Sequence, residues 1–137
     1  MSLDTQEVPS GFGPIFRSSP LLDTLGDFYS RGAGAALELG IRVSERHTNA
    51  RGDLHGGVIA TLADIGMGYL LAFQTDPPRR FVTVSLTVDY VAPATKDDWV
   101  EVRLDAVQLT GRLAFTTARL VSGDHVIACA RGVFSAA

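Results

Sequence analysis

The longest apolar run of the chain, residues 56–73 with the sequence GGVIATLADIGMGYLLAF, constrains the fold more than any other segment. Its length is typical of a helix, because strands seldom exceed about ten residues. The run is apolar on every side, so other elements must wrap around it if its surface is to be buried. It contains Asp64 and four glycines and is shorter than the roughly 20 apolar residues of a spanning helix, so we expect no insertion into a membrane.

Alternating apolar and polar residues on both sides of this helix predict antiparallel strands. We expect a short strand at about 27–31 and longer ones at about 37–43, 82–90, 99–110, 112–121 and 125–134, with a β-bulge near Ala106 and Val107. The order of strand, long helix and four further strands predicts an α+β fold. In this fold a curved antiparallel sheet of five to six strands is folded around the long central helix.

Glycine and proline are frequent in residues 1–20, which predicts an irregular N-terminal arm followed by a single domain over residues 21–137. A helical turn is expected after Ser19 and Pro20. The formal charge of −3 and the absence of a basic block argue against a nucleic-acid partner.

Nothing at the N-terminus resembles a signal peptide, which favours a cytoplasmic protein. The single cysteine, Cys129, lies in an apolar strand-like run and is expected to be a buried thiol, as suits a reducing compartment. No His, Cys or Asp residues show the spacing of a metal site, so we expect neither a metal nor another cofactor.

Gly56 and Gly57 lie where the chain enters the predicted helix. The first N–H groups of a helix lack intrahelical partners and lie at the positive end of its dipole, and glycine lets a ligand approach them closely. Such groups suit a carbonyl oxygen that gains negative charge during a reaction. Alone, the two glycines are a weak signal, because glycine is common at helix starts.

Asp64 is the only carboxylate of the apolar helix and follows Gly57 by seven residues, on nearly the same face. Burying an unpaired carboxylate is costly, so a buried one has partners or titrates abnormally. Seven residues span ~10 Å of helix axis, too far for Asp64 to act on a group held at Gly57 of its own chain. An antiparallel helix from a second subunit would join the two positions, which predicts a composite site at a two-fold interface. The alternative is that Asp64 only hydrogen-bonds to a hydroxyl or backbone group there.

The string H-T-N-A-x-G-x-L-H-G-G-x-x-A-T-L-x-D, from His47 to Asp64, closely resembles the PaaI-like acyl-CoA thioesterases of the hotdog superfamily. The resemblance extends over about residues 25–135 and includes the strand FVTVSLTVDYVAPA. It implies a hotdog fold and an enzyme, a thioester hydrolase that converts an aryl- or fatty-acyl-CoA into a free acid and CoA.

The resemblance also implies roles for individual residues. The amide of Gly57, aided by Asn49, would hold the thioester oxygen, while His55 would support that turn or lie near the departing thiolate. Asp64 of the opposing subunit would be the general base or the nucleophile, and Thr83 would orient the attacking water. For Asn49, His55 and Thr83, purely structural roles remain open as alternatives.

Four further residues are expected at the substrate. Gly56 would lie beside the thioester, Arg79 and Arg80 at the phosphates of CoA, and Met67 in the lining of the acyl pocket. The expected partners are the acyl-CoA substrate and further copies of the chain, in a homodimer and in a homotetramer made of two dimers. The rival hypothesis is a non-catalytic hotdog protein that binds acyl-CoA or lipid as a sensor or carrier.

Overall fold

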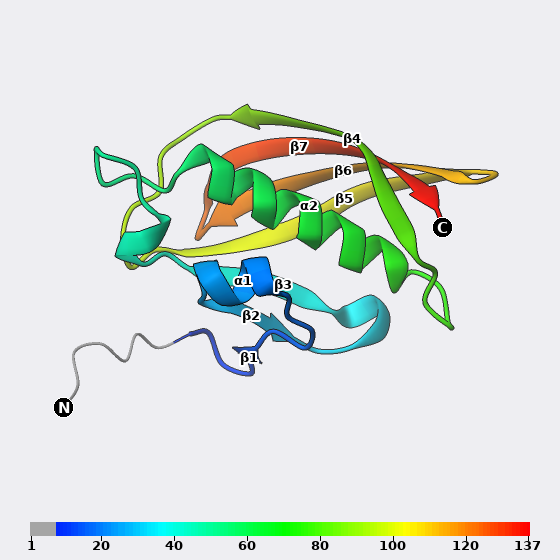
Figure 1. Ribbon diagram of the computed structural model, residues 1–137, viewed down its shortest axis with the longest axis horizontal. Helices are drawn as coiled ribbons and strands as arrows, with labels where there is room; N and C mark the ends of the chain where they lie inside the picture. The colour runs from blue at the N-terminus through cyan, green and yellow to red at the C-terminus, as the bar shows by residue number, and fades with distance from the viewer. Residues whose placement is uncertain (1–7) are drawn as a thin grey trace.

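The computed structural model describes residues 8–137, which form an open antiparallel sheet of seven strands with a long helix across it (Figure 1). The strands are β1 (Gly13–Pro14), β2 (Phe28–Arg31), β3 (Glu38–Arg42), β4 (Phe81–Tyr90), β5 (Trp99–Thr110), β6 (Leu113–Ser122) and β7 (His125–Ala136). The long helix is α2 (Gly56–Ala72), and a short one, α1 (Pro20–Leu25), precedes β2. The spatial order of the strands is β1-β2-β3-β5-β6-β7-β4. The α+β prediction is therefore confirmed, with seven strands instead of five to six.

The additional strand, β1, lies in the segment for which an irregular arm was predicted. It pairs with β2 over two residues, Gly13 and Pro14. The neighbouring Phe12 is buried, its ring packs edge-on against Trp99 at 4.8 Å, and the guanidinium of Arg31 lies over it at 4.4 Å. These contacts attach the arm to the sheet, a role that the local sequence of glycines and prolines does not reveal. The first part of the predicted arm, residues 1–7, lies outside the described residues.

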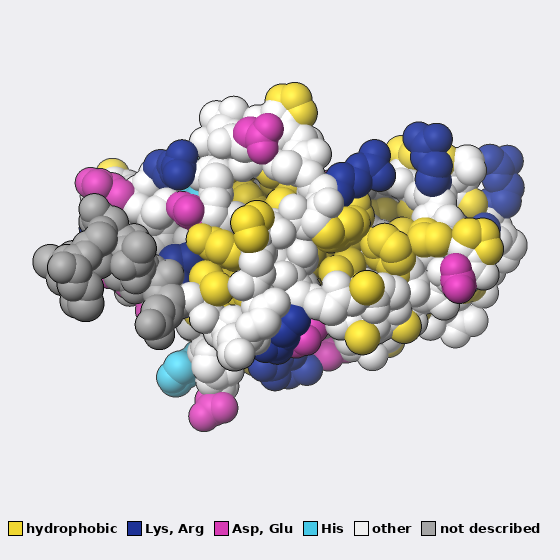
Figure 2. All heavy atoms as spheres, turned by 90° about the horizontal axis from the view of Figure 1, so that it is seen from below, with side chains coloured by type: hydrophobic (Ala, Val, Ile, Leu, Met, Phe, Trp, Pro, Cys, Tyr) yellow, Lys and Arg dark blue, Asp and Glu magenta, His cyan; other side chains and the backbone are white. Residues whose placement is uncertain are grey.

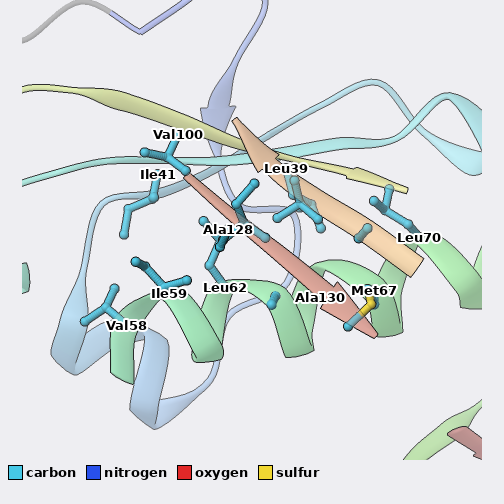
Figure 3. Packing of buried hydrophobic residues seen from close by; sticks show 14 of the residues in the cluster. Leu39, Ile41, Val58, Ile59, Leu62, Met67, Leu70, Val100, Ala128 and Ala130 are labelled. Atoms are coloured by element: carbon cyan, nitrogen blue, oxygen red, sulfur yellow. The ribbon is translucent and has the colours of Figure 1, made fainter. Parts of the chain in front are cut away.

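The core lies between α2 and the inner face of the sheet. Figure 3 shows Ile59 and Leu62 of α2 directed at the sheet, where small residues such as Ala128 and Ala130 on β7 leave room for the helix. At Gly66 the helix lies so close to the sheet that an added Cβ would be 2.7 Å from a methyl carbon of Val102. The buried positions of α2 recur in pairs every four residues, as one helical face requires: Val58, Ile59, Leu62, Ala63, Gly66, Met67, Leu70 and Leu71.

The opposite face of α2 is only partly covered in the described chain, where Thr83 and Tyr90 of β4 reach it at Asp64 and Gly56. Its residues remain half-exposed, and all but Ile65 are small or polar: Ala60, Thr61, Asp64, Ile65 and Gly68. The sheet of a single chain thus covers one side of a helix whose sequence is apolar all round. The side chain of Asp64 is therefore partly exposed to solvent. No helix among the described residues is both long and apolar enough to cross a membrane.

Strand β4 borders the sheet, since it pairs with β7 alone. Its register shifts between Thr83 and Ser85, so one extra residue, Val84, is accommodated as a β-bulge. The sequence alternation continues unbroken through this strand, but the bulge reverses which residues face the helix. Thr83 pairs with the buried Phe134, and further along Leu86 lies beside Gly132 on that same inner side. The predicted bulge in β5 is also present, as a shift between Leu104 and Ala106.

The prediction of a buried Cys129 is wrong. Its neighbours Ala128 and Ala130 face the helix, so the alternation of the strand turns Cys129 to the outer face of the sheet, where the thiol is exposed. There it lies opposite Arg119 of β6 and Asp89 of β4. Cys129 lies between two alanines, so the local sequence does not show which face of the strand it occupies.

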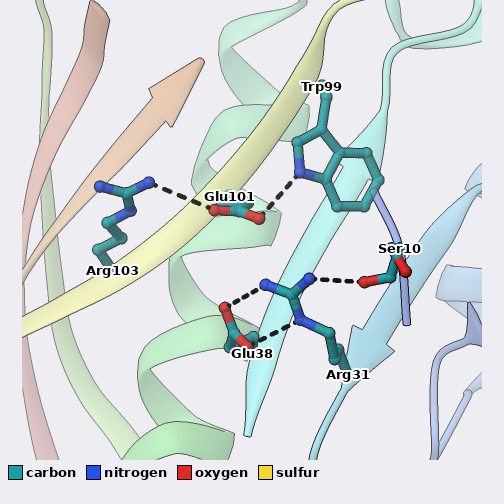
Figure 4. Close-up of polar contacts among 6 residues, drawn as sticks. All are labelled: Ser10, Arg31, Glu38, Trp99, Glu101 and Arg103. Atoms are coloured by element: carbon teal, nitrogen blue, oxygen red, sulfur yellow. Dashed lines mark hydrogen bonds and ion pairs between the residues drawn. The ribbon is translucent and has the colours of Figure 1, made fainter. Parts of the chain in front are cut away.

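Polar pairs hold the outer face of β2, β3 and β5 together (Figure 4). Arg31 donates to both carboxylate oxygens of Glu38 at 2.8 and 2.9 Å and to the carbonyl of Ser10 at 2.7 Å. Beside them Glu101 accepts from the indole of Trp99 at 3.0 Å. The hydrogen bonds from Arg31 lower the pKa of Glu38 below its ordinary value.

Replacing Glu38 with Gln tests this pair. The side chains of Arg31 and Glu38 are 35% and 46% exposed, so we expect a loss of only about 0.5 kcal/mol in the free energy of unfolding at pH 7. Because the folded-state pKa of Glu38 is lowered, this contribution is present above the unfolded-state pKa, roughly 4.3, and disappears as the pH falls through the folded value. Urea denaturation at pH 7 and at lower pH measures it. The exposed Glu45 provides a control variant, Glu45→Gln, and an effect of Glu38→Gln that is equal at all pH values would contradict the prediction.

Candidate active site

A carboxylate–hydroxyl pair lies between α2 and β4. The hydroxyl of Thr83 donates to Oδ1 of Asp64 at 2.7 Å. The β4 bulge makes this contact, because it turns Thr83 toward the helix instead of away from it. Asp64 is half-buried, and the second carboxylate oxygen has no partner among residues 8–137. The pair therefore holds the carboxylate in one orientation and leaves one oxygen able to accept a proton.

The N-terminus of α2 carries the second group of candidate residues. His55 is the N-cap, and its Nδ1 accepts from the amide of Gly57 at 2.9 Å. Both residues are exposed. The imidazole thus supports the turn, one of the two roles expected for it, and it occupies the N–H that was expected to hold the thioester oxygen.

Tyr90, at the far end of β4, also reaches this N-terminus. Its hydroxyl donates to the carbonyl oxygen of Gly56 at 2.8 Å. A Cβ on Gly56 would lie 3.2 Å from ring carbons of Tyr90, so glycine makes room for the ring. Sequence reasoning assigned Tyr90 only to the alternation of a strand. The signal that could have indicated it is the combination of a glycine at a helix start and an aromatic residue on the inner side of the neighbouring strand.

Asn49 organises the loop before α2. Its side-chain oxygen accepts from the backbone N–H groups of Arg51 and Asp53, at 2.9 and 3.2 Å. The side-chain NH₂ group has no partner within the described part of the chain, so the residue caps the loop and still has a free donor. His47, from the same motif, is fully buried and joins this loop to the end of α1: Ser44 N–H donates to its Nδ1, and its Nε2 lies 2.9 Å from the carbonyl oxygen of Leu25.

Asn49, Gly56 and Tyr90 line one cavity of about 360 Å³ at the start of α2. Asp64 is not part of this cavity, because it lies two turns further along the helix, ~10 Å from Gly57. The described chain therefore presents two separate groups of candidate residues, one at the start of α2 and one two turns along it. One offers hydrogen-bond donors and the other a carboxylate.

A second cavity of about 360 Å³ begins at Ile65, the residue after Asp64, and extends along α2 past Gly68. Phe16 lies edge-on to Tyr69 and Phe73, with ring centroids 5.0 and 5.6 Å away, and the three rings line it. The cavity also contains three arginines, Arg17, Arg79 and Arg80, which form no ion pair with any residue of the described range. Figure 2 shows a face of the molecule on which hydrophobic side chains gather beside Lys and Arg side chains. Sequence reasoning found Arg79 and Arg80 but missed Phe16 and Arg17, which come from a segment far away in the chain.

Met67, which was expected to line the acyl pocket, lines neither of these two cavities. Its side chain is fully buried on the sheet side of α2, and its sulfur lies 3.2 Å from the hydroxyl of Thr116 on β6. The helical position decides this, because Met67 shares its face with the core residues Ala63 and Leu70. Tyr69, two residues later, faces the cavity instead.

Comparison with known proteins gives a family for this arrangement. Residues 51–129 match the model of the thioesterase superfamily. A candidate esterase of Pseudomonas aeruginosa is 48% identical over 128 residues, which cover 93% of this chain and 96% of that protein. Human acyl-coenzyme A thioesterase 13 is 35% identical over 83 residues, or 60% of this chain and 58% of that protein.

Solved structures share the fold. A mutant of the phenylacetic acid degradation protein PaaI from Thermus thermophilus superposes with a TM-score of 0.73 at 24% identity, over 85% of this chain and 98% of that one. Thioesterase superfamily member 2 from Mus musculus gives a TM-score of 0.71 at 25% identity, over 85% and 86%. The resemblance read from residues 47–64 is thereby confirmed. The chain belongs to the thioesterase superfamily, as a thioester hydrolase of the hotdog fold.

Proposed function

We propose that this thioester hydrolase is an acyl-CoA thioesterase that converts an aryl- or fatty-acyl-CoA into the free acid and CoA, in a site composed from two copies of the chain. The observation that carries the proposal is the held carboxylate of Asp64, which Thr83 orients at 2.7 Å on a half-exposed helix face. A protein that only binds a thioester needs no such base. The human relative named as an acyl-coenzyme A thioesterase supports CoA as the carrier of the acyl group.

The chemical step follows from the two half-sites. The free oxygen of Asp64 takes a proton from water while the water oxygen bonds to the thioester carbon. The oxygen of the thioester becomes negatively charged and accepts from the amide of Gly57 and the free NH₂ of Asn49. To do so it displaces Nδ1 of His55 from the Gly57 N–H. The carbon–sulfur bond then breaks, CoA leaves as the thiolate, and the acid and a proton are released.

Two copies are required because one helix keeps its donor and its base ~10 Å apart. Strand β4 offers a surface on which a second copy can pair. It is a ten-residue strand at the border of the sheet, and its Val82 and Val84 side chains are 58% and 59% exposed. Such an edge is prone to uncontrolled association unless another strand covers it. A homodimer formed through β4 would pair the free backbone groups of this edge, and two such dimers would form the homotetramer.

The variant Asp64→Asn tests the role of the carboxylate. We expect kcat to fall at least about 100-fold, because the amide cannot accept the proton, while KM and the melting temperature change little. Release of free thiol from a panel of acyl-CoAs, followed with a thiol reagent, measures this. Equal rates for Asp64→Asn and the wild type would exclude Asp64 as the base. Tight binding of acyl-CoA with no thiol release by the wild type would favour the sensor or carrier instead.

Mixing two inactive variants tests the composite site. Gly57→Pro removes the amide donor at a helix position that tolerates proline, and Asp64→Asn removes the base. When the two variants are unfolded together and refolded as mixed dimers, half of the dimers are hybrids with one intact site of two, so about a quarter of the wild-type activity should return. Each variant refolded alone is the control. Absence of recovery in mixtures that contain hybrid dimers would show that one chain supplies both groups.

The cavity lined by the three arginines is proposed to hold the nucleotide part of CoA. Its phosphates would lie at Arg79 and Arg80, and its adenine against the rings of Phe16, Tyr69 and Phe73. Arg80→Gln should raise KM for an acyl-CoA about tenfold and leave kcat unchanged, because one charged phosphate contact is lost far from the reacting carbon. The same acyl group on N-acetylcysteamine, which lacks the nucleotide, should show no difference between variant and wild type. Arg131→Gln, on the outer face of β7, is the matched control. An equal rise of KM for both substrates would show that Arg80 does not act on the nucleotide part of CoA.

A further inference from the structure

The peptide bond between Gly56 and Gly57 is held from both of its ends. On one side the Gly57 N–H donates to His55 at 2.9 Å, and on the other the Gly56 carbonyl accepts from the hydroxyl of Tyr90 at 2.8 Å. The two backbone groups belong to one planar unit, so a rotation of the carbonyl also rotates the N–H. His55 must leave the N–H when substrate binds, whereas Tyr90 is attached to the opposite end and can stay.

We propose that Tyr90 is a positioning residue for the reaction: through the Gly56 carbonyl it fixes and polarises the Gly57 N–H that holds the thioester oxygen. This inference rests on the function proposed above. A hydrogen bond to the carbonyl oxygen of an amide strengthens the same amide as a donor, because hydrogen bonds in a chain polarise one another. If the Gly57 N–H already points at the thioester oxygen, no reorganisation is needed when negative charge develops on that oxygen.

The packing at Gly56 shows that the contact is built into the site. Glycine lets the ring of Tyr90 approach without displacement, since an added Cβ would lie 3.2 Å from two ring carbons and 3.3 Å from the hydroxyl oxygen and would push the ring away by a few tenths of an ångström. The sequence thus combines a glycine at the first position of α2 with a tyrosine at the last position of β4. Gly57, in contrast, has only the His55 ring near its own added Cβ, at 3.3 Å, and its surroundings are open for a ligand.

Strand β4 consequently holds both half-sites of its own chain. Thr83 near its start orients Asp64, and Tyr90 at its end orients the peptide before Gly57. The β4 bulge puts both side chains on the inner face, since Tyr90 lies opposite the buried Ala128 as Thr83 lies opposite Phe134. One strand therefore sets the orientation of the base and of the oxyanion donor.

The test compares Tyr90→Phe with Tyr29→Phe. Phenylalanine keeps the ring against Gly56 and removes the hydroxyl, whereas Tyr29 lies on β2 and its hydroxyl has no hydrogen-bond partner among the described residues. With ¹⁵N-glycine labelling, the amide signal of Gly57 should shift in Tyr90→Phe and not in Tyr29→Phe. With acyl-CoA, kcat should fall about tenfold in Tyr90→Phe with KM within about twofold of wild type, because the effect is on the charged oxygen.

Each outcome has one meaning. An unmoved Gly57 signal in Tyr90→Phe overturns the positioning role whatever the activity. A shifted signal with unchanged kcat overturns its part in the reaction. If the signal shifts but wild-type protein hydrolyses no acyl-CoA of the panel, the coupling between Tyr90 and the Gly57 amide stands and the proposed function fails. An equal loss of kcat in both tyrosine variants would assign the effect to general stability and contradict the proposal.

Discussion

The structure depends on how closely α2 packs against the sheet. Small residues on both surfaces allow this approach: Gly66 on the helix meets Val102, and alanines at 128 and 130 form the opposing surface of β7. Eight helix residues are buried on that side, and removing their apolar surface from water stabilises the fold. Because this contact uses one face of the helix, residues on the other face stay half-exposed, and β4 reaches only some of them. Asp64 lies on this half-exposed face.

The elements of the fold could be predicted from the sequence because each has a strong local pattern. The helix is a long apolar run, and β3 to β7 alternate over five to twelve residues. The local pattern could not reveal the places where a contact with a distant residue decides whether a strand forms or which way its side chains face. β1 forms because Phe12 packs on Trp99, although its sequence is a Gly-Pro pair. In β4 the alternation reads the same with or without the bulge, so only the pairing with β7 shows that Thr83 faces inward.

The candidate site shows the same division. Asp64, Gly57, His55 and Asn49 stand close together in the sequence, and a resemblance over 18 residues was enough to select them. The actual partners of these residues come from elsewhere in the chain. Tyr90 lies 34 residues from Gly56, and the ring of Phe16 reaches Tyr69 from the N-terminal segment. Cys129 was placed on the wrong face for a different reason, and Met67 lies away from both cavities for the same one: in segments that are apolar on both faces, composition does not reveal which face is the core.

The arrangement of β4 links subunit pairing to the chemistry of the site. If a second copy pairs along this edge, its backbone hydrogen bonds fix the twist and the position of the strand. Thr83 and Tyr90 project from the same strand, so their contacts with Asp64 and Gly56 would be fixed along with it. In the free chain the edge has no partner on its outer side, and β7 alone holds it. Dimer formation would then do more than bring the base of one chain to the oxyanion donor of the other. It would also make each half-site more rigid, since the strand that orients both groups becomes an interior strand of a continuous sheet.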